Sequence, residues 1–242
     1  MVLFFLKKCI ISSEVVNLKE RYILKEEISK IKIPNYSLSE EIINSLSHGI
    51  AAAFSIAGLI LMIVKASHES VTNLVTVTIF GTAMIILYTI SCIYHALSPH
   101  IMGKKILRVI DHTNVFLLVL GTILPVSLVG IGGIQGYFFF GFVAIVTLVG
   151  IFASCVNIDK VQWIEVLCHL MNGWSVLLFV KPLISHMGLT PVLFIILGGV
   201  MYSLGAILYG VGSKKKYIHC VFHFFCIFGT IFHFIAIYGY LI

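Results

Sequence analysis

Three histidines at the ends of apolar stretches have the types and spacing that hold a metal ion. His219 and His223 are four residues apart, so on a helix their imidazoles lie on one face about one turn apart. His95 ends another apolar stretch and would add a third nitrogen ligand. Three protein ligands plus a water are the arrangement of catalytic zinc, whereas structural zinc sites close all four positions. The pattern predicts a zinc centre with one open position.

Two further polar residues are expected beside this centre. Asp111 lies near the start of its own apolar stretch and could orient a bound water or accept its proton. Ser91 precedes His95 by one helical turn and could hydrogen-bond a water or a substrate carbonyl. These residues favour a metal-dependent hydrolase. A serine hydrolase built on Ser91 and His95 is less favoured, because both residues lie on one helix.

Other interpretations of the same residues stay open. Aromatic-rich membrane helices also use histidine as an interfacial polar group, without any metal. Cys92 and Cys220 each stand three residues before a candidate ligand. Either cysteine could supply a thiolate to the metal or serve only in packing.

More polar residues recur at helical spacing in other apolar stretches. Glu41, Asn44 and His48 form a polar stripe that either packs one helix against its neighbours or joins the site. Glu165 and His169 are four apart, and a hydrogen bond between them is expected. His233 comes ten residues after His223 and so lies roughly 15 Å further along a helix. We therefore expect His233 outside the metal centre.

These residues are exceptions in a chain with the composition of a membrane protein. Of its 242 residues, 60% are hydrophobic and 11% are charged, and the mean hydropathy is +1.08. A soluble globule of this size cannot hide so much apolar surface, and a disordered chain is excluded on the same grounds. The apolar runs are long and continuous, which excludes the alternating pattern of a membrane β-barrel.

The apolar runs predict an all-α membrane protein, a seven-transmembrane helix bundle occupying residues 41–242. A span needs about 20 apolar residues. A capping-box pattern from Ser37 to Glu40 opens the first helix. The expected spans are 42–64, 74–97, 107–129, 136–156, 162–181, 190–212 and 218–241.

Lysine and arginine set the expected orientation. Fourteen of the 16 fall in the N-terminal arm and in the second, fourth and sixth loops, and two fall in the other loops. Cytoplasmic segments carry the excess of these residues. The N-terminus is therefore expected inside and the C-terminus outside, the reverse of a G-protein-coupled receptor. Under this topology His95, Asp111, His219 and His223 share one depth near the inner face.

Residues 1–40 differ in composition and are expected to form a cytoplasmic arm. They hold seven of the 16 Lys and Arg and five of the 10 Asp and Glu. The segment 18–33 fits an amphipathic helix lying on the membrane surface, or else a solvated arm. The net charge of +6 comes from the arm and loops, so we expect membrane lipids as partners and no nucleic acid.

Four ordered motifs resemble the hemolysin III family, the bacterial branch of the progestin and adiponectin receptor superfamily. The resemblance covers residues from about 40 to 242. Its motifs are Glu41-x-x-Asn44-x-x-Ser47-His48-Gly49, Ser91-x-x-x-His95, Asp111 followed by Gly121-Thr122-x-x-Pro125, and His219-x-x-x-His223. The resemblance implies zinc held by His95, His219 and His223, with Asp111 acting through the metal-bound water. It also implies a seven-helix bundle with its N-terminus inside.

The same resemblance implies two kinds of function. The superfamily's adiponectin receptors, with the related alkaline ceramidases, imply a zinc-dependent intramembrane hydrolase of lipid amides or esters, acting in membrane lipid homeostasis. The family's name implies instead a non-enzymatic, pore-forming cytolysin, and a zinc-containing membrane sensor is a further alternative. No span carries a long polar face, which disfavours a large pore. The expected location is the plasma membrane, as a multi-pass protein of a bacterial inner membrane.

Overall fold

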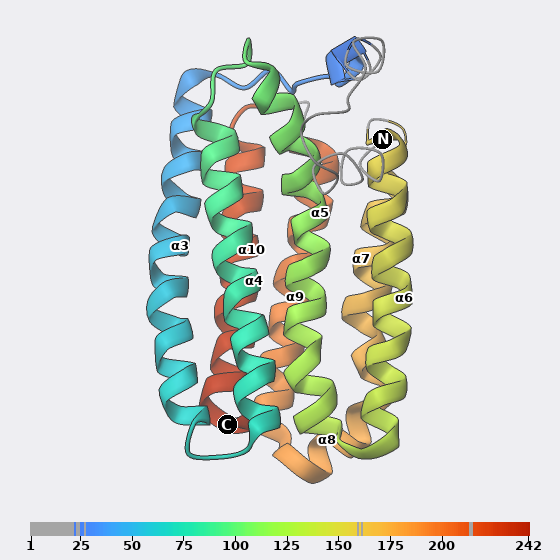
Figure 1. The fold of residues 1–242 in the computed structure, drawn as a ribbon. Helices are drawn as coiled ribbons and strands as arrows, with labels where there is room; N and C mark the ends of the chain where they lie inside the picture. Colours follow the sequence, from blue (N-terminus) through green and yellow to red (C-terminus); the bar gives the residue numbers. More distant parts are fainter. Residues whose placement is uncertain (1–21, 23–24, 27, 159, 161, 213–214) are drawn as a thin grey trace.

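A computed structural model of the chain describes residues 22, 25–26, 28–158, 160, 162–212 and 215–242 (Figure 1). Within these residues, seven segments are long and apolar enough to cross a membrane. They run side by side as a bundle, and no strand occurs in the described part (Figure 1). The predicted all-α, seven-span fold is confirmed.

Most spans are single helices, and their bounds lie close to those expected. The third span continues from α5 into a π-helical segment, and the seventh continues likewise from α10. The elements are α3 (Leu38–Ala66), α4 (Val71–Ala96), α5 (Met102–Pro125) with η1 (Val126–Ile131), α6 (Gly133–Asn157), α9 (Leu189–Gly212), and α10 (Ile218–Ala236) with η3 (Ile237–Leu241).

The fifth span is broken, which the apolar pattern alone did not predict. It consists of α7 (Gln162–Trp174), a 3-10 segment (Ser175–Phe179) and α8 (Val180–Met187). At the other end of the chain, the predicted capping box of α3 is confirmed. The Ser37 side chain accepts from the Glu40 N–H, and the Glu40 carboxylate accepts the Ser37 N–H at 2.9 Å.

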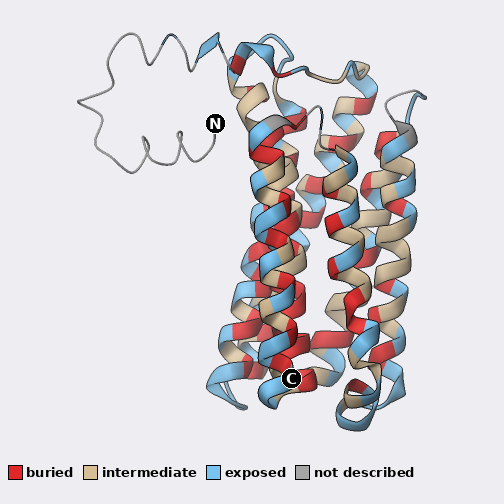
Figure 2. Cartoon of the chain, turned by 90° about the vertical axis from the view of Figure 1, so that its right-hand side faces the viewer, coloured by how far each residue is buried: buried red, intermediate tan, exposed pale blue. Residues whose placement is uncertain are grey.

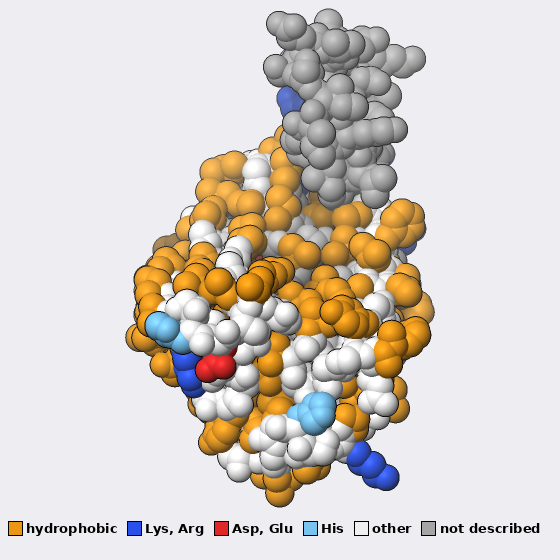
Figure 3. All heavy atoms as spheres, turned by 60° about the horizontal axis from the view of Figure 1, so that its bottom comes forward, with side chains coloured by type: hydrophobic (Ala, Val, Ile, Leu, Met, Phe, Trp, Pro, Cys, Tyr) orange, Lys and Arg blue, Asp and Glu red, His pale blue; other side chains and the backbone are white. Residues whose placement is uncertain are grey.

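Along α3, small and polar residues face the interior of the bundle and large apolar residues face outward. The buried face of α3 carries Asn44, His48, Ala51, Ser55 and Gly58, whereas its large hydrophobic side chains, such as Phe54, are exposed. Exposed stretches alternate with buried ones along the helices in Figure 2, and hydrophobic side chains dominate the surface in Figure 3. Lipid tails are as apolar as the side chains, so the hydrophobic effect does not drive the helices together. Small residues contribute instead, because they let neighbouring helices approach closely.

A close approach of α4 and α5 sets the spacing of the two helices that carry Ser91, His95 and Asp111. A Cβ atom at Gly121 would lie 3.0 Å from the Ala83 Cβ and 3.4 Å from the Phe80 Cα. A Cβ atom there would require Ala83 or the α4 backbone to shift by a few tenths of an ångström. One glycine therefore fixes the relative position of the segments that bear the candidate site.

The end of the N-terminal arm packs on the bundle. Ile31 is buried in a small cluster with Val109 and Ile158. Arg108 donates to the Lys32 carbonyl at 2.6 Å, and Lys105 donates to the Ser29 carbonyl. Residues 22, 25–26 and 28–30 are helical. The rest of the expected surface helix over 18–33 lies outside the described residues, so that helix remains a prediction.

The helices α3, α5, α7 and α10 begin at the end of the bundle where the arm packs, and the C-terminus lies at the opposite end (Figure 1). The candidate residues therefore gather at the arm end. That this end faces the cytoplasm stays a prediction from the charge distribution.

Candidate metal centre

The structure brings His95, His219 and His223 together at the arm end of the bundle. All three are buried, and one ring nitrogen from each lies within 4.8 Å of the others. His95 comes from the last turn of α4, while His219 and His223 lie on one face at the start of α10. The Nε2 atoms of His219 and His223 are 3.1 Å apart. A group of this kind can hold a metal ion.

The orientation of the His95 ring fits a metal ligand. Its Nδ1–H donates to Oε2 of Glu41 at 2.6 Å. Its Nε2 is buried with no hydrogen-bond partner among the described residues. Metal-ligating imidazoles usually donate their other ring N–H to a carboxylate or a carbonyl. The buried, unpartnered Nε2 atom is the one that a cation would satisfy.

Glu41 is itself held by a buried lysine. Lys104 donates from Nζ to Oε1 of Glu41 at 2.5 Å and to the Leu97 carbonyl at 2.8 Å, and its side chain is fully buried. The Lys104 ammonium compensates the charge of the Glu41 carboxylate and fixes it in place. The sequence pattern did not predict Lys104 as a residue of the site. Its charge is explained equally well by a loop whose positive charges set the orientation in the membrane.

The rest of the polar stripe on α3 also faces this centre. The Asn44 amide nitrogen lies 3.5 Å from Nδ1 of His95. The His48 ring stacks on His223 with centroids 3.9 Å apart and an interplanar angle of 15°. Both His48 ring nitrogens are buried and lack partners in the part of the chain that the structure describes. Of the two interpretations left open for the stripe, the geometry favours the one that joins it to the site.

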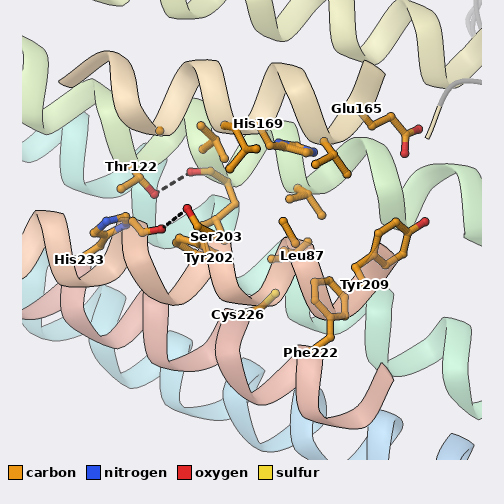
Figure 4. A pocket seen from close by; sticks show the side chains of 18 of the residues that line it. Leu87, Thr122, Glu165, His169, Tyr202, Ser203, Tyr209, Phe222, Cys226 and His233 are labelled. Atoms are coloured by element: carbon orange, nitrogen blue, oxygen red, sulfur yellow. Dashed lines mark hydrogen bonds between the residues drawn. The ribbon is translucent and has the colours of Figure 1, made fainter. Parts of the chain in front are cut away.

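An elongated cavity of about 180 Å³ opens from the centre into the bundle. Ser91, Asp111 and His223 line it near the histidines, and Asp111 interacts with Ser91. Figure 4 shows the cavity from close by, with Tyr209 and Phe222 toward one end and His233 at the other. Most of the lining between its ends is apolar. Two of the predicted metal ligands, His219 and His223, therefore face one space with the predicted catalytic residues Asp111 and Ser91, whereas His95 does not line it.

One sequence-based expectation is wrong. Glu165 accepts a hydrogen bond from Nδ1 of His112 at 3.1 Å rather than one from His169. The His169 ring stacks on Phe116 instead, with centroids 3.8 Å apart. Residues four apart on a helix can meet, but α5 presents a histidine to Glu165 from the neighbouring helix. Sequence spacing along one helix carries no signal for such a partner.

The remaining candidate residues lie apart from the histidine group. His233 donates from Nε2 to the Ile195 carbonyl at 3.1 Å and lines the far end of the cavity, as expected from its distance along α10. Sγ of Cys92 lies 3.5 Å from the Ser45 hydroxyl, and Cys220 donates to the Glu40 carbonyl at 3.7 Å. Neither thiol belongs to the group of candidate metal ligands among the described residues.

Sequence reasoning also missed Tyr36, at the junction of the arm and α3. Its ring stacks on His219 with centroids 4.7 Å apart and an interplanar angle of 20°. It also lies 6.0 Å from the His95 ring. The arm thus contributes a side chain that covers the centre from outside the bundle.

Comparison with known families finds a match over most of the chain. The family described as haemolysin-III related matches residues 36–234, which contain every residue of the candidate centre. The chain belongs to the hemolysin III family. Its relatives include Hemolysin-3 of Bacillus cereus, 29% identical over 206 residues that cover 85% of this chain and 93% of the relative. They also include the Hemolysin-3 homolog of Bacillus subtilis (strain 168), 31% identical over 196 residues, with 81% and 91% covered. The protein is therefore a multi-pass membrane protein of the hemolysin III type.

Proposed function

We propose that the protein is a zinc-dependent hydrolase of lipid amides or esters within the membrane. The observation that carries the proposal is the buried three-histidine group at the head of an apolar cavity lined by Asp111 and Ser91, with Nε2 of His95 lacking a partner among the described residues. Zinc is the metal that three imidazoles and one open position suit best. Zinc bound there would polarise a carbonyl oxygen and lower the pKa of a water in its open position.

The side chains around the centre would then carry the proton. Asp111 takes a proton from the attacking water, whose oxygen bonds to the carbonyl carbon of the lipid. The bond from that carbon to nitrogen or oxygen breaks, and Asp111 returns the proton to the leaving amine or alcohol. The products are a fatty acid and an amine or alcohol. Ser91, which interacts with Asp111, orients the carboxylate and hydrogen-bonds the carbonyl.

The cavity supports a lipid substrate because its walls match an acyl chain. Leu118, Val119, Ile123 and Ile195 line the stretch beyond the histidines. A chain lying among them would be shielded from water, which strengthens the polar interactions at its head. With lipids as partners, the enzyme would act in membrane lipid homeostasis at the plasma membrane, in a bacterium the inner membrane. Residues 41–242 would form the catalytic domain and residues 1–40 a cytoplasmic arm.

The test measures metal and turnover on the same purified protein. We expect about one zinc per chain, together with release of fatty acid from a lipid amide or ester. Changing His223 to Ala should abolish both. His68→Ala is the matched control, since His68 is exposed and lies outside both the ligand group and the cavity. Folded, metal-free protein that still hydrolyses lipid would reject the proposal.

A pore-forming cytolysin and a zinc-containing sensor remain the competing functions, and the names of the relatives motivate the first. Release of dye from liposomes separates the pore from the enzyme. Leakage that survives His95→Ala would favour a pore, because the metal ligand is then irrelevant to it. A sensor would bind zinc and give a phenotype on deletion without any lipid turnover.

A further inference from the structure

A buried carboxylate with no part in the proposed reaction lines the main cavity on the side of α7. Glu165 is only 4% exposed, and its Oε2 accepts a hydrogen bond from Nδ1 of His112 at 3.1 Å. Its other oxygen, Oε1, is buried and has no hydrogen-bond partner among the described residues. A buried carboxylate oxygen without a donor is costly. Because Glu165 lines the cavity, a ligand there could supply the missing donor.

The side chains around Glu165 do not supply this donor themselves. The Ser154 hydroxyl is close to Glu165, but its single hydrogen goes to the Gly150 carbonyl, 2.9 Å away. His169 comes one helical turn later on α7, and its ring stacks on Phe116. Nδ1 of His169 is also buried without a partner in the described part of the chain. Two residues one turn apart, each with an unpartnered buried atom, therefore line one wall of the cavity.

The charges along the cavity favour a cationic ligand group. Its described lining contains two carboxylates, Asp111 and Glu165, and no lysine or arginine. Asp111 lies beside the histidine group, where a metal cation would offset its charge. The ion-pair partner of Glu165 is His112, which is charged only when protonated. An ammonium group would compensate the Glu165 carboxylate and give Oε1 a charge-assisted hydrogen bond.

Glu165 lies where the head of a lipid would lie rather than its chain. Figure 4 shows Glu165 and Tyr209 toward one end of the cavity and His233 at the other. His112, which holds the Glu165 carboxylate, directly follows Asp111 in α5. A lipid chain directed toward His233 would therefore leave its polar head at Glu165, near the residues of the candidate metal centre.

We propose that Glu165 binds a primary ammonium group in the head of a lipid whose chain occupies the main cavity. The ammonium donates one N–H to Oε1 of Glu165 and a second to Nδ1 of His169. The role of this lipid as a substrate rests on the proposed hydrolase function, and its leaving group would then carry the ammonium. The binding site itself does not rest on that function, because it depends only on the unpartnered atoms and on the charges of the cavity.

The test compares three ether lipids that a hydrolase of amides or esters cannot cleave. They are 1-O-hexadecylglycerol, the analogue in which an ammonium replaces the 3-hydroxyl, and the N,N,N-trimethyl form of that analogue. Binding to the purified full chain in neutral detergent at neutral pH is measured by native mass spectrometry. We expect the wild type to bind the ammonium probe about tenfold more tightly or better than the other two, because it alone combines a charge with N–H donors.

Variants assign this preference to the α7 wall of the cavity. Glu165→Gln keeps the size of the side chain and an acceptor for His112 but removes the charge, so the three affinities should come to within about twofold of one another. Glu69→Gln makes the same change at an exposed carboxylate outside the cavity, and the preference should persist. His169→Phe keeps an aromatic ring against Phe116 but removes Nδ1, and should lower the preference by about fivefold. This variant keeps the proposal testable if Glu165→Gln misfolds.

Four outcomes decide between the possibilities. Equal binding of the ammonium and glycerol probes by the wild type would overturn the site, and so would an undiminished preference in Glu165→Gln. Equal binding of the ammonium and trimethyl probes would show that charge alone attracts the lipid, and would overturn the hydrogen bond to Oε1. A preference retained in protein that hydrolyses no lipid would reject the hydrolase and leave the ammonium site standing. Hydrolysis by protein that shows no preference would do the reverse.

Discussion

Nδ1 of His95 lies 2.6 Å from Oε2 of Glu41, across the contact between α4 and α3. This hydrogen bond fixes which nitrogen of the ring carries the proton, and it leaves Nε2, which has no partner among the described residues, as the nitrogen that can bind a metal. The other oxygen of the same carboxylate accepts from Lys104 at 2.5 Å. A chain of contacts thus runs from a buried cation through a carboxylate to a candidate metal ligand.

Weakening this orientation should loosen the metal without unfolding the protein. Glu41→Gln keeps the size of the side chain but loses its charge. We expect metal affinity to fall by about 10- to 100-fold, the usual effect of losing a partner of a metal ligand. Competition with a chromophoric chelator measures the affinity. Glu69→Gln changes an exposed glutamate and should leave it unaltered. An unchanged affinity in Glu41→Gln would show that the carboxylate does not orient His95.

Lys104 should matter for stability more than a surface lysine does. Lys104→Met leaves the Glu41 carboxylate without its buried cation, and breaking a buried pair in this way costs about 3–5 kcal/mol. Thermal unfolding in detergent should show a large drop in the midpoint. The double variant Lys104→Met with Glu41→Gln should recover much of it, because no uncompensated charge remains. Additive losses in the double variant would contradict a direct pairing.

The sequence predicted the number of spans well, since each is a long apolar run and lipid leaves few alternatives to a helix. The histidine group could also be predicted, because His219 and His223 share a helical face and His95 lies at the same depth. The periodicity of one helix specifies which residues share a face. It also made the stripe of Glu41, Asn44 and His48 visible.

What the sequence could not supply were contacts between helices. The partner of Glu165 is His112 on another helix, not His169 on its own, and nothing in the spacing specifies that pairing. The burial of Lys104 and the stacking of Tyr36 on His219 depend on how the loop and the arm fold over the bundle. Such contacts arise from the tertiary arrangement, which single-helix periodicity does not encode.

The contact at Gly121 predicts a position where one methyl group is harmful. Gly121→Ala would place a Cβ 3.0 Å from the Ala83 Cβ and force α4 and α5 apart. We expect a loss of about 1–3 kcal/mol of stability, typical of overpacking, and weaker metal binding as His95 shifts. In Gly141→Ala the new Cβ meets nothing within 4 Å, so the helix should instead gain slightly. Unfolding midpoints of the two variants test the difference, and similar behaviour would contradict it.

Removal of metal should destabilise the protein through the histidine group. A ligand present at 1,000 times its dissociation constant stabilises the folded state by about 4 kcal/mol. Dialysis against a chelator should therefore lower the unfolding midpoint of the wild type, and added zinc should restore it. In His223→Ala the chelator should have no effect, whereas His233→Ala should respond like the wild type. A chelator effect that persists in His223→Ala would place the metal elsewhere.

Asp111 and Ser91 should affect turnover while leaving the metal in place. Neither belongs to the histidine group, yet both line the cavity beside it. If Asp111 moves the proton, Asp111→Asn should lower kcat by about 10²–10⁴-fold, the usual contribution of a general base. Zinc content should stay near that of the wild type. Ser91→Ala should lower kcat less, because it removes a hydroxyl that only orients the carboxylate and the carbonyl. Steady-state hydrolysis and metal analysis on the same preparations distinguish these roles. If Asp111→Asn lost its zinc, the carboxylate would be a metal ligand rather than a base.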